Sequence, residues 1–355
     1  MKKLNNLLLL LTFWGCFFSA CTSDPEPQVA VDTYDHGVLI VNEGNFFSGD
    51  GEVTHFNKET GEVTNNLYQS VNGVVLAAYI EQVRVYGEKA YIVDSNQGGA
   101  KVVAVDKATF RETGRVEGLE IPRDVAVAAD RLFIADWGNY DDEGNYTNPN
   151  SFIAVADIDS GEIIDRIPVS SRPQSIVALE DFIYVISEAG KEIIKINPTT
   201  LEIVSRKTHD ATPKELLISG NQLLLYSTLG EKLHLDVLDP ATLLSTKTVL
   251  DISNSTRVVL GDGGQAWALT SAYSADYSYT DNAVISFSTT GNGSAKTVFQ
   301  ARNLRGIGVD KAKGQLFIAD DNGIQGNGTV VITDLQGQEI QKLDVGRVPS
   351  KFYFY

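Results

Sequence analysis

Basic residues recur at one point of a repeating pattern, and they are the strongest candidates for binding chemistry in this sequence. The seven equivalent positions, aligned at the start of successive strand-like runs, are Glu81, Arg123, Gln174, Lys214, Arg257, Arg305 and Ser350. Arginine can bind phosphate or carboxylate through two parallel hydrogen bonds. The pattern predicts a positive collar that attracts an anionic group. The alternative is internal pairing with carboxylates such as Asp124 or Glu215.

Three insertions of unequal length, at 43–50, 137–150 and 271–282, combine aromatic rings with amide and hydroxyl side chains. Such residues suit a ligand that has apolar faces and polar edges. The alternative is that these rings only pack against their own loops. The candidate ligand-binding residues in the insertions are Asn45, Phe46, Trp137, Tyr140, Tyr146, Tyr273 and Tyr277.

Catalytic and metal-binding motifs give no comparable signal. The four histidines lack metal-ligand spacing, and the sequence contains no nucleophile elbow, phosphate loop or dinucleotide fingerprint. The series Asn139, Asp141, Glu143 weakly resembles a calcium loop, but Asn150 stands where a closing glutamate is needed. We therefore predict no catalytic site, no cofactor and no metal site, so the chain is not expected to be an enzyme.

The elements that position these residues are strands. Runs rich in Val, Ile, Tyr and Phe alternate with turn residues, and one apolar run in each unit ends in a polar residue. Seven units of this kind predict an all-β, seven-bladed β-propeller. The runs that we assign to the second strand of each blade are 39–42, 91–94, 133–136, 184–187, 224–227, 267–270 and 317–320.

The last nine residues, 347–355, resemble the beginning of a repeat unit, and the strand that should follow them is 38–42. We therefore expect the first blade to be closed by the N- and C-terminal strands. Strands in a blade alternate in direction, so the insertions and the collar belong to one face, which we call the upper face. The short turns between first and second strands belong to the opposite, lower face. Their residues are those of tight turns and indicate no binding function.

The N-terminus resembles a lipoprotein signal. Lys2 and Lys3 precede an apolar run, and Ser19 and Ala20 precede Cys21. We predict a signal peptide at 1–20, lipidation of Cys21, a flexible tether at 21–35 and the propeller at 36–355. An ordinary secretory signal is the alternative. Without Lys2 and Lys3 the formal charge changes from −17 to −19. Such an acidic chain is a poor partner for nucleic acid, and we expect membrane association only through the lipid.

The strand 91–94 followed by 102–106 resembles the repeat of YVTN-type, YncE-like propellers, and the segment 41–46 resembles the start of DUF5074-like surface lipoproteins of Bacteroidota. This broad group includes BtuG-like lipoproteins that capture cobalamin for a TonB-dependent outer-membrane transporter. The resemblance implies an outer-membrane, lipid-anchored protein at the cell surface. It also implies a corrinoid ligand and a TonB-dependent receptor as partner. The alternatives are a protein-interaction scaffold and a calcium-dependent, lactonase-like hydrolase.

Overall fold

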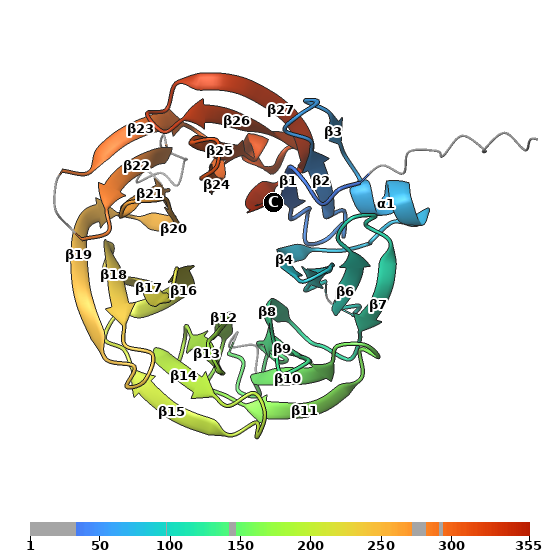
Figure 1. Ribbon diagram of the computed structural model, residues 1–355, viewed down its shortest axis with the longest axis vertical. Helices are drawn as coiled ribbons and strands as arrows, with labels where there is room; N and C mark the ends of the chain where they lie inside the picture. The colour runs from blue at the N-terminus through green and yellow to red at the C-terminus, as the bar shows by residue number, and fades with distance from the viewer. Residues whose placement is uncertain (1–32, 97, 142–146, 272–281, 291–293) are drawn as a thin grey trace, which may run out of the picture. The chain divides into compact units, whose positions relative to one another are not determined.

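The computed structural model describes residues 33–96, 98–141, 147–271, 282–290 and 294–355. These residues form seven four-stranded antiparallel sheets arranged as blades around a central axis (Figure 1). Strands β4, β8, β12, β16, β20 and β24 lie innermost, and β28 takes this place in blade one. The prediction of a seven-bladed propeller is confirmed.

In chain order, the elements of blades one to four are β1 (Val38–Asn42), β2 (Glu52–Phe56), β3 (Val63–Thr64), α1 (Leu67–Asn72), β4 (Ile80–Tyr86), β5 (Lys89–Asp94), β6 (Lys101–Asp106), β7 (Glu112–Val116), β8 (Pro122–Ala128), β9 (Arg131–Asp136), β10 (Phe152–Asp157), β11 (Ile163–Pro168), β12 (Pro173–Leu179), β13 (Phe182–Ser187), β14 (Glu192–Ile196) and β15 (Ile203–Thr208). Blades five to seven, with the strand that closes blade one, comprise β16 (Thr212–Ser219), β17 (Gln222–Leu229), β18 (Lys232–Leu238), β19 (Ser245–Ser253), β20 (Ser255–Leu260), β21 (Gln265–Thr270), β22 (Asn282–Ser288), β23 (Lys296–Ala301), β24 (Leu304–Asp310), β25 (Gln315–Asp320), the short 3₁₀ helix η1 (Asn322–Ile324), β26 (Asn327–Asp334), β27 (Glu339–Arg347) and β28 (Pro349–Phe354).

The second strand of each blade is almost completely buried, as its apolar sequence predicts. In β13, for example, Ile183 to Ile186 are all 0% exposed. Both faces of this strand pack against neighbouring blades, which explains why its sequence is an apolar run and does not alternate. The apolar side chains form seven clusters, and each cluster lies between two adjacent blades. The core is therefore a ring, and each blade depends on both of its neighbours.

Blade one joins the two ends of the propeller, as predicted. Strand β28 pairs antiparallel with β1, placing Val38 opposite Phe354 and Ile40 opposite Phe352. Phe352 and Phe354 also contact Phe317 of blade seven, with ring centroids 5.8 and 5.1 Å apart. The closing strand thus completes one blade and covers the face of the next.

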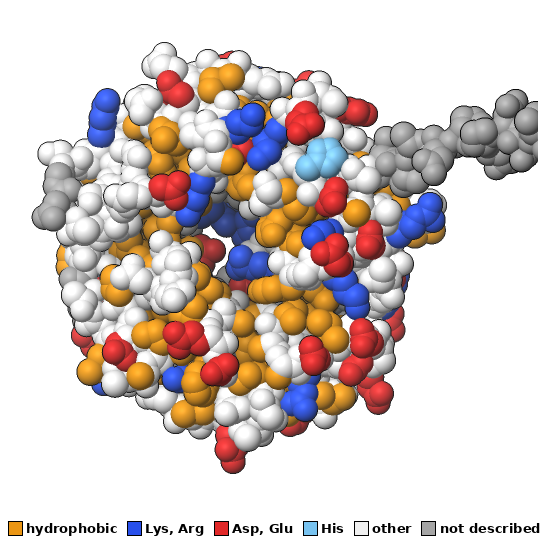
Figure 2. All heavy atoms as spheres, viewed as in Figure 1, with side chains coloured by type: hydrophobic (Ala, Val, Ile, Leu, Met, Phe, Trp, Pro, Cys, Tyr) orange, Lys and Arg blue, Asp and Glu red, His pale blue; other side chains and the backbone are white. Residues whose placement is uncertain are grey.

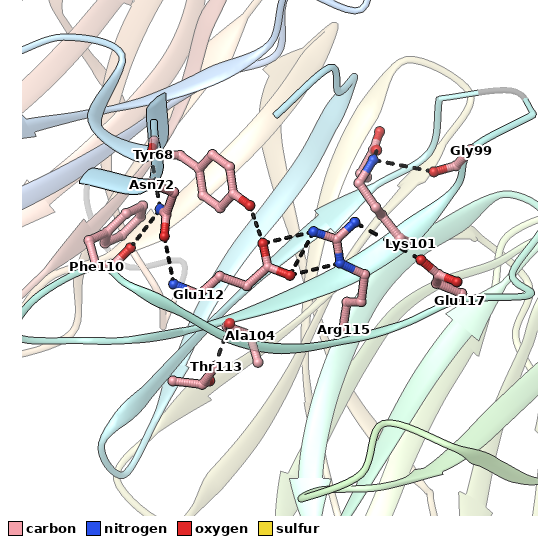
Figure 3. A network of polar contacts seen from close by, with 11 residues as sticks. Tyr68, Asn72, Gly99, Lys101, Ala104, Phe110, Glu112, Thr113, Arg115 and Glu117 are labelled. Atoms are coloured by element: carbon pink, nitrogen blue, oxygen red, sulfur yellow. Dashed lines mark hydrogen bonds and ion pairs between the residues drawn. The ribbon is translucent and has the colours of Figure 1, made fainter. Parts of the chain in front are cut away.

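Blade one has an outer strand of only two residues, and helix α1 takes part of its place. The helix packs against the outer strand of blade two through the polar network in Figure 3. Tyr68 donates a hydrogen bond to Glu112, which also binds Arg115 through two hydrogen bonds of 2.7 and 2.8 Å. Asn72 donates to the carbonyl of Phe110 at 3.1 Å and accepts from the N–H of Glu112 at 2.9 Å. These contacts hold α1 on blade two.

Glu52, next to this helix, gives the stability of the propeller a predictable dependence on pH. Burial raises the pKa of its carboxyl to about 7, although the Thr54 hydroxyl and the N–H groups of Asn66 and Leu67 lower it. The folded chain therefore holds this proton more tightly than the unfolded chain does, and stability falls as pH rises from about 4.5 to 7. Glu52→Gln should leave stability unchanged at pH 4 and increase it by about 2 kcal/mol at pH 8, allowing for the screening of a partly exposed group.

Denaturant unfolding of both chains between pH 4 and 8 measures this difference. If the stabilities of the two chains differ by the same amount at every pH, burial does not raise the pKa of Glu52.

Candidate functional site

Every innermost strand carries a β-bulge near its start, at the upper end of the channel. A bulge adds one residue to a strand and redirects its side chain. We call these seven residues the collar. They are Glu81, Arg123, Gln174, Lys214, Thr256, Arg305 and Ser350.

The collar matches the sequence alignment at six positions and corrects it at one. Thr256, and not Arg257, is the bulged residue of blade six, because Ser255 pairs with Thr270 and Arg257 with Leu269. Blades two, six and seven have Ile80, Ser255 and Leu304 where the other four blades have proline, so the alignment had no proline to follow there, and in blade six it fell one residue late. Arg257 belongs instead to a second tier that follows the bulge. Its members are Gln82, Asp124, Ser175, Glu215, Arg257, Gly306 and Lys351.

Three of the predicted basic residues of the collar form ion pairs. Arg123 pairs with Glu81, Lys214 with Glu188, and Arg305 with Glu43, the last at 2.5 Å. Burial raises the pKa of Glu43, but Arg305 and Lys351 outweigh it and hold the pKa below its usual value. Internal pairing therefore occurs, as the alternative interpretation stated, but through carboxylates other than Asp124 and Glu215.

Asp124 instead binds Arg84, a residue that the sequence analysis did not single out. The two side chains form a bidentate pair with both hydrogen bonds at 2.9 Å. Asp124 also accepts from the N–H of Ile176 at 3.3 Å. Arg84, Asp124 and Ile176 belong to blades two, three and four, so one carboxylate joins three blades at the wall of the channel.

Arg257 and Lys351 have no carboxylate partner within the described part of the chain. The Nε atom of Arg257 is buried without a hydrogen bond, and Lys351 donates only to the backbone carbonyl of Glu81. Burial lowers the pKa of Lys351 to about 8, and the positive charge of Arg257 adds to this effect. Glu215, at the equivalent place in blade five, also lacks an ion pair among the described residues. The second tier thus contains two cations, Arg257 and Lys351, and one anion, Glu215, that form no ion pair among the described residues.

A central cavity of about 260 Å³ lies at the upper end of the channel and is lined by residues of both tiers. Figure 2 shows the opening at the centre of the ring, with Lys and Arg side chains inside it. Several lining residues have a buried polar atom with no partner among the described residues. These atoms are Nε of Arg123, Nε1 of Trp137, Oε1 of Gln174 and Nε of Arg257. Such unused hydrogen-bonding capacity is rare in folded proteins and is typical of binding sites.

Trp137 forms the aromatic part of the cavity wall. Its ring contacts two guanidinium groups, and the ring centroid is 4.4 Å from Cζ of Arg123 and 5.0 Å from Cζ of Arg172. The preceding residue, Asp136, holds the loop in place by accepting hydrogen bonds from the N–H groups of Glu120, Ile121 and Gly138 at 2.8–2.9 Å. Burial raises the pKa of Asp136, although these hydrogen bonds lower it. The indole is therefore a fixed platform at the upper end of the channel.

A second cavity of about 190 Å³ adjoins the first and shares Arg123 and Trp137 with it. Phe46, Tyr79 and Tyr140 line it, and the rings of Phe46 and Tyr79 meet edge to face at 5.5 Å. Tyr79 was not among the ligand-binding residues predicted from the sequence; it stands just before β4 and outside the insertions. Asn45 lies apart from both cavities and stabilises its own turn, where its Oδ1 accepts from the N–H of Phe47 at 2.9 Å.

The structure thus brings together Arg123, Lys214 and Arg257 in the central cavity, and Phe46, Trp137 and Tyr140 around the adjoining one. Arg305 lines a separate polar cavity of about 150 Å³ with Glu43 and Arg257. Four predicted residues fall outside the described residues. They are Cys21, Tyr146, Tyr273 and Tyr277.

Arg84 and Lys351, which line the channel, and Arg172, which contacts Trp137, were not predicted from the sequence. Lys351 follows the collar residue Ser350 by one position, and Arg84 follows the collar residue Glu81 by three. No signal in the sequence distinguishes Arg172. Among the described residues, no group of three or more His, Cys, Asp or Glu side chains is placed to hold a metal ion. The helices of this part of the chain include none with the length and apolar character needed to cross a membrane.

A family model described as "Domain of unknown function (DUF5074)" matches residues 36–354. The chain belongs to this family. The match covers the whole propeller of this DUF5074 protein and confirms that part of the resemblance. None of the curated proteins compared with the chain matches it.

Solved structures share the fold of this DUF5074 protein at low sequence identity. A quinonprotein alcohol dehydrogenase-like protein from Bacteroides thetaiotaomicron has a TM-score of 0.67 and 12% identity, over 91% of this chain and 79% of its own. Hydrazine synthase from Kuenenia stuttgartiensis has a TM-score of 0.59 and 19% identity, over 74% and 86%. A functionally unknown protein from Desulfotomaculum acetoxidans has a TM-score of 0.61 and 11% identity, over 90% and 98%. These likenesses concern the fold alone.

Proposed function

We propose that this DUF5074 protein is a lipoprotein of the outer-membrane surface that binds a small molecule at the upper face of its propeller. In this proposal the ligand is a corrinoid such as cobalamin, and a TonB-dependent receptor accepts it from the propeller. Cys21 carries the lipid that anchors the chain. The propeller acts as a binding protein and not as an enzyme.

The observation that carries the proposal is the position of Trp137, which contacts the guanidinium groups of Arg123 and Arg172 and lines both the central cavity and the adjoining one. A fixed aromatic platform suits a flat, conjugated ring, and the neighbouring guanidinium and amide groups suit a ligand edge that carries amides. A corrinoid is larger than these cavities. We therefore propose that one edge of the ligand enters the central cavity while the rest lies across the upper face.

Binding of cyanocobalamin to the chain from residue 22 onward, measured by isothermal titration calorimetry, tests this proposal. Trp137→Ala should weaken binding on the order of 30-fold, because a buried aromatic anchor contributes about 2 kcal/mol. Phe152→Ala is the matched control: its ring contacts Arg166 at 5.4 Å on the same blade but does not line the channel. Wild-type affinity in the Trp137 variant, or absence of binding at high micromolar cobalamin, would contradict the proposal.

The second candidate function is a protein-interaction scaffold. It is favoured by Phe47, which is 94% exposed in the blade-one insertion of the upper face. Exposed aromatic side chains are enriched where proteins bind each other. Co-purification of a membrane protein with the propeller, together with no binding of cyanocobalamin, would favour this function over the first.

A further inference from the structure

The largest cavity described opens at the other end of the channel, on the lower face. Its volume is about 470 Å³, and the innermost strands of blades five, six, seven and one supply most of its wall. The sequence analysis assigned only turns to this face. Its wall is mixed: Ile218, Val259, Leu260 and Phe352 are among its apolar residues, and Lys311 adds a charge outside the inner end.

Charged residues form the inner end of this apolar cavity. Five residues line both the lower cavity and the central cavity, and we call them the waist: Gln82, Arg84, Glu215, Arg257 and Lys351. Asp124 neutralises Arg84. Of the other charged residues of the waist, Arg257 and Lys351 are cations and Glu215 is an anion. Glu43, Glu81 and Glu215 act on Lys351, so Arg257 is the waist cation whose charge no carboxylate contact offsets among the described residues. A cavity with apolar side chains along its wall and the Arg257 guanidinium at its inner end is complementary to a molecule with an alkyl chain and one anionic end.

Glycines of blade seven let the closing strand pack closely against β24 at the wall of this cavity. Gly306 stands between Arg257 and Lys351 in the second tier and contributes no side chain. A Cβ atom there would lie 2.0 Å from the carbonyl oxygen of Ser350. A Cβ atom at Gly308 would lie 2.8 Å from the ring of Phe352. The close approach of β28 to β24 therefore requires glycine at both positions, and Arg257 and Lys351 line the cavity on either side of Gly306 in the ring.

We propose that the lower cavity binds an amphipathic carboxylate, with the carboxylate between Arg257 and Lys351 and the alkyl chain against Val259 and Phe352. The Arg257 guanidinium, which has no carboxylate partner in the described chain, supplies the main charge-assisted hydrogen bonds. Arg257 and Lys351 also line the central cavity, so this site adjoins the upper-face site, but its ligand enters from the lower face and does not require the proposed function.

Calorimetry with octanoate, octanol and inorganic phosphate tests the site on the chain from residue 22 onward. Octanoate should bind at least 10-fold more tightly than octanol, which lacks the charge, and than phosphate, which lacks the chain. Arg257→Met should weaken octanoate binding by about 30-fold, which is the effect expected when a charged hydrogen-bond donor is lost. Equal affinity for octanoate and octanol, or for octanoate and phosphate, would overturn the proposal.

A matched pair of substitutions locates the ligand at the lower face. Ile218 is 41% exposed at the rim of the cavity, whereas Ile164 is 50% exposed on the outer strand of blade three. Ile218→Asp places a negative charge at the entrance and should weaken octanoate binding at least 10-fold, and Ile164→Asp should leave it unchanged. Circular dichroism confirms that both variants fold. Octanoate binding that is the same in both variants would place the ligand elsewhere.

Discussion

Deleting residues 347–355 should reduce the stability of the propeller by more than about 5 kcal/mol, a large part of the total for a folded domain. The deletion removes β28 and leaves β1, whose residues Val38 to Val41 are 0–1% exposed, as an open edge. It also uncovers Phe317 of blade seven. Thermal unfolding followed by circular dichroism measures the loss. We expect either no cooperative transition or a midpoint far below that of the intact chain.

A chain that lacks residues 1–32 is the control for this deletion and should melt like the full chain. A synthetic peptide of residues 347–355, added in excess, should restore part of the lost stability by pairing with β1. If the chain without these residues melts at the same temperature as the intact chain, ring closure by β28 does not stabilise the fold.

Asp124→Ala should destabilise the propeller by about 3–5 kcal/mol, which is the usual effect of removing one partner from a buried ion pair. Asp124 is 3% exposed and joins three blades through Arg84 and the N–H of Ile176. Its loss leaves a positive charge in the channel wall next to two other cations, Arg257 and Lys351. Denaturant unfolding measures the difference in the free energy of unfolding.

The double substitution Arg84→Met with Asp124→Leu should recover most of this stability, because it removes the charge together with its partner. Asp251→Ala is the surface control. Asp251 also pairs with a cation, Lys232, but its side chain is 94% exposed, so no measurable change is expected. Equal effects of Asp124→Ala and Asp251→Ala would mean that burial of the Arg84–Asp124 pair contributes nothing to stability.

The blades were predictable from the sequence because local composition determines them. The second strands are apolar on both faces, and the polar residue that ends each one, such as Asp136, fixes the loop that follows. The pairing of 347–355 with 38–42 was predictable for the same reason. The C-terminal segment resembles the first strand of a repeat unit, and the strand that should pair with it lies at the N-terminal end of the propeller.

The electrostatics of the site were only partly predictable. The collar was placed correctly wherever the repeat pattern was clear, and it was wrong by one residue at Arg257. Ion-pair partners such as Glu43 and Arg305 lie 262 positions apart in the chain. Their contact depends on the packing of neighbouring blades, about which a local pattern carries no information. The lower cavity was missed because its lining residues have the apolar character of any core strand.

Lys351 lies on the closing strand, so it is synthesised after the other residues of the waist. Arg257 is in place once blade six has formed, but the waist is complete only when the chain has extended through Lys351 and β28 has paired with β1. The proposed lower site therefore needs the closing strand, because a chain that ends before Lys351 lacks one of its two cations. An anion bound between Arg257 and Lys351 would in turn stabilise the closed ring, because the closing strand could detach only after the ligand had dissociated.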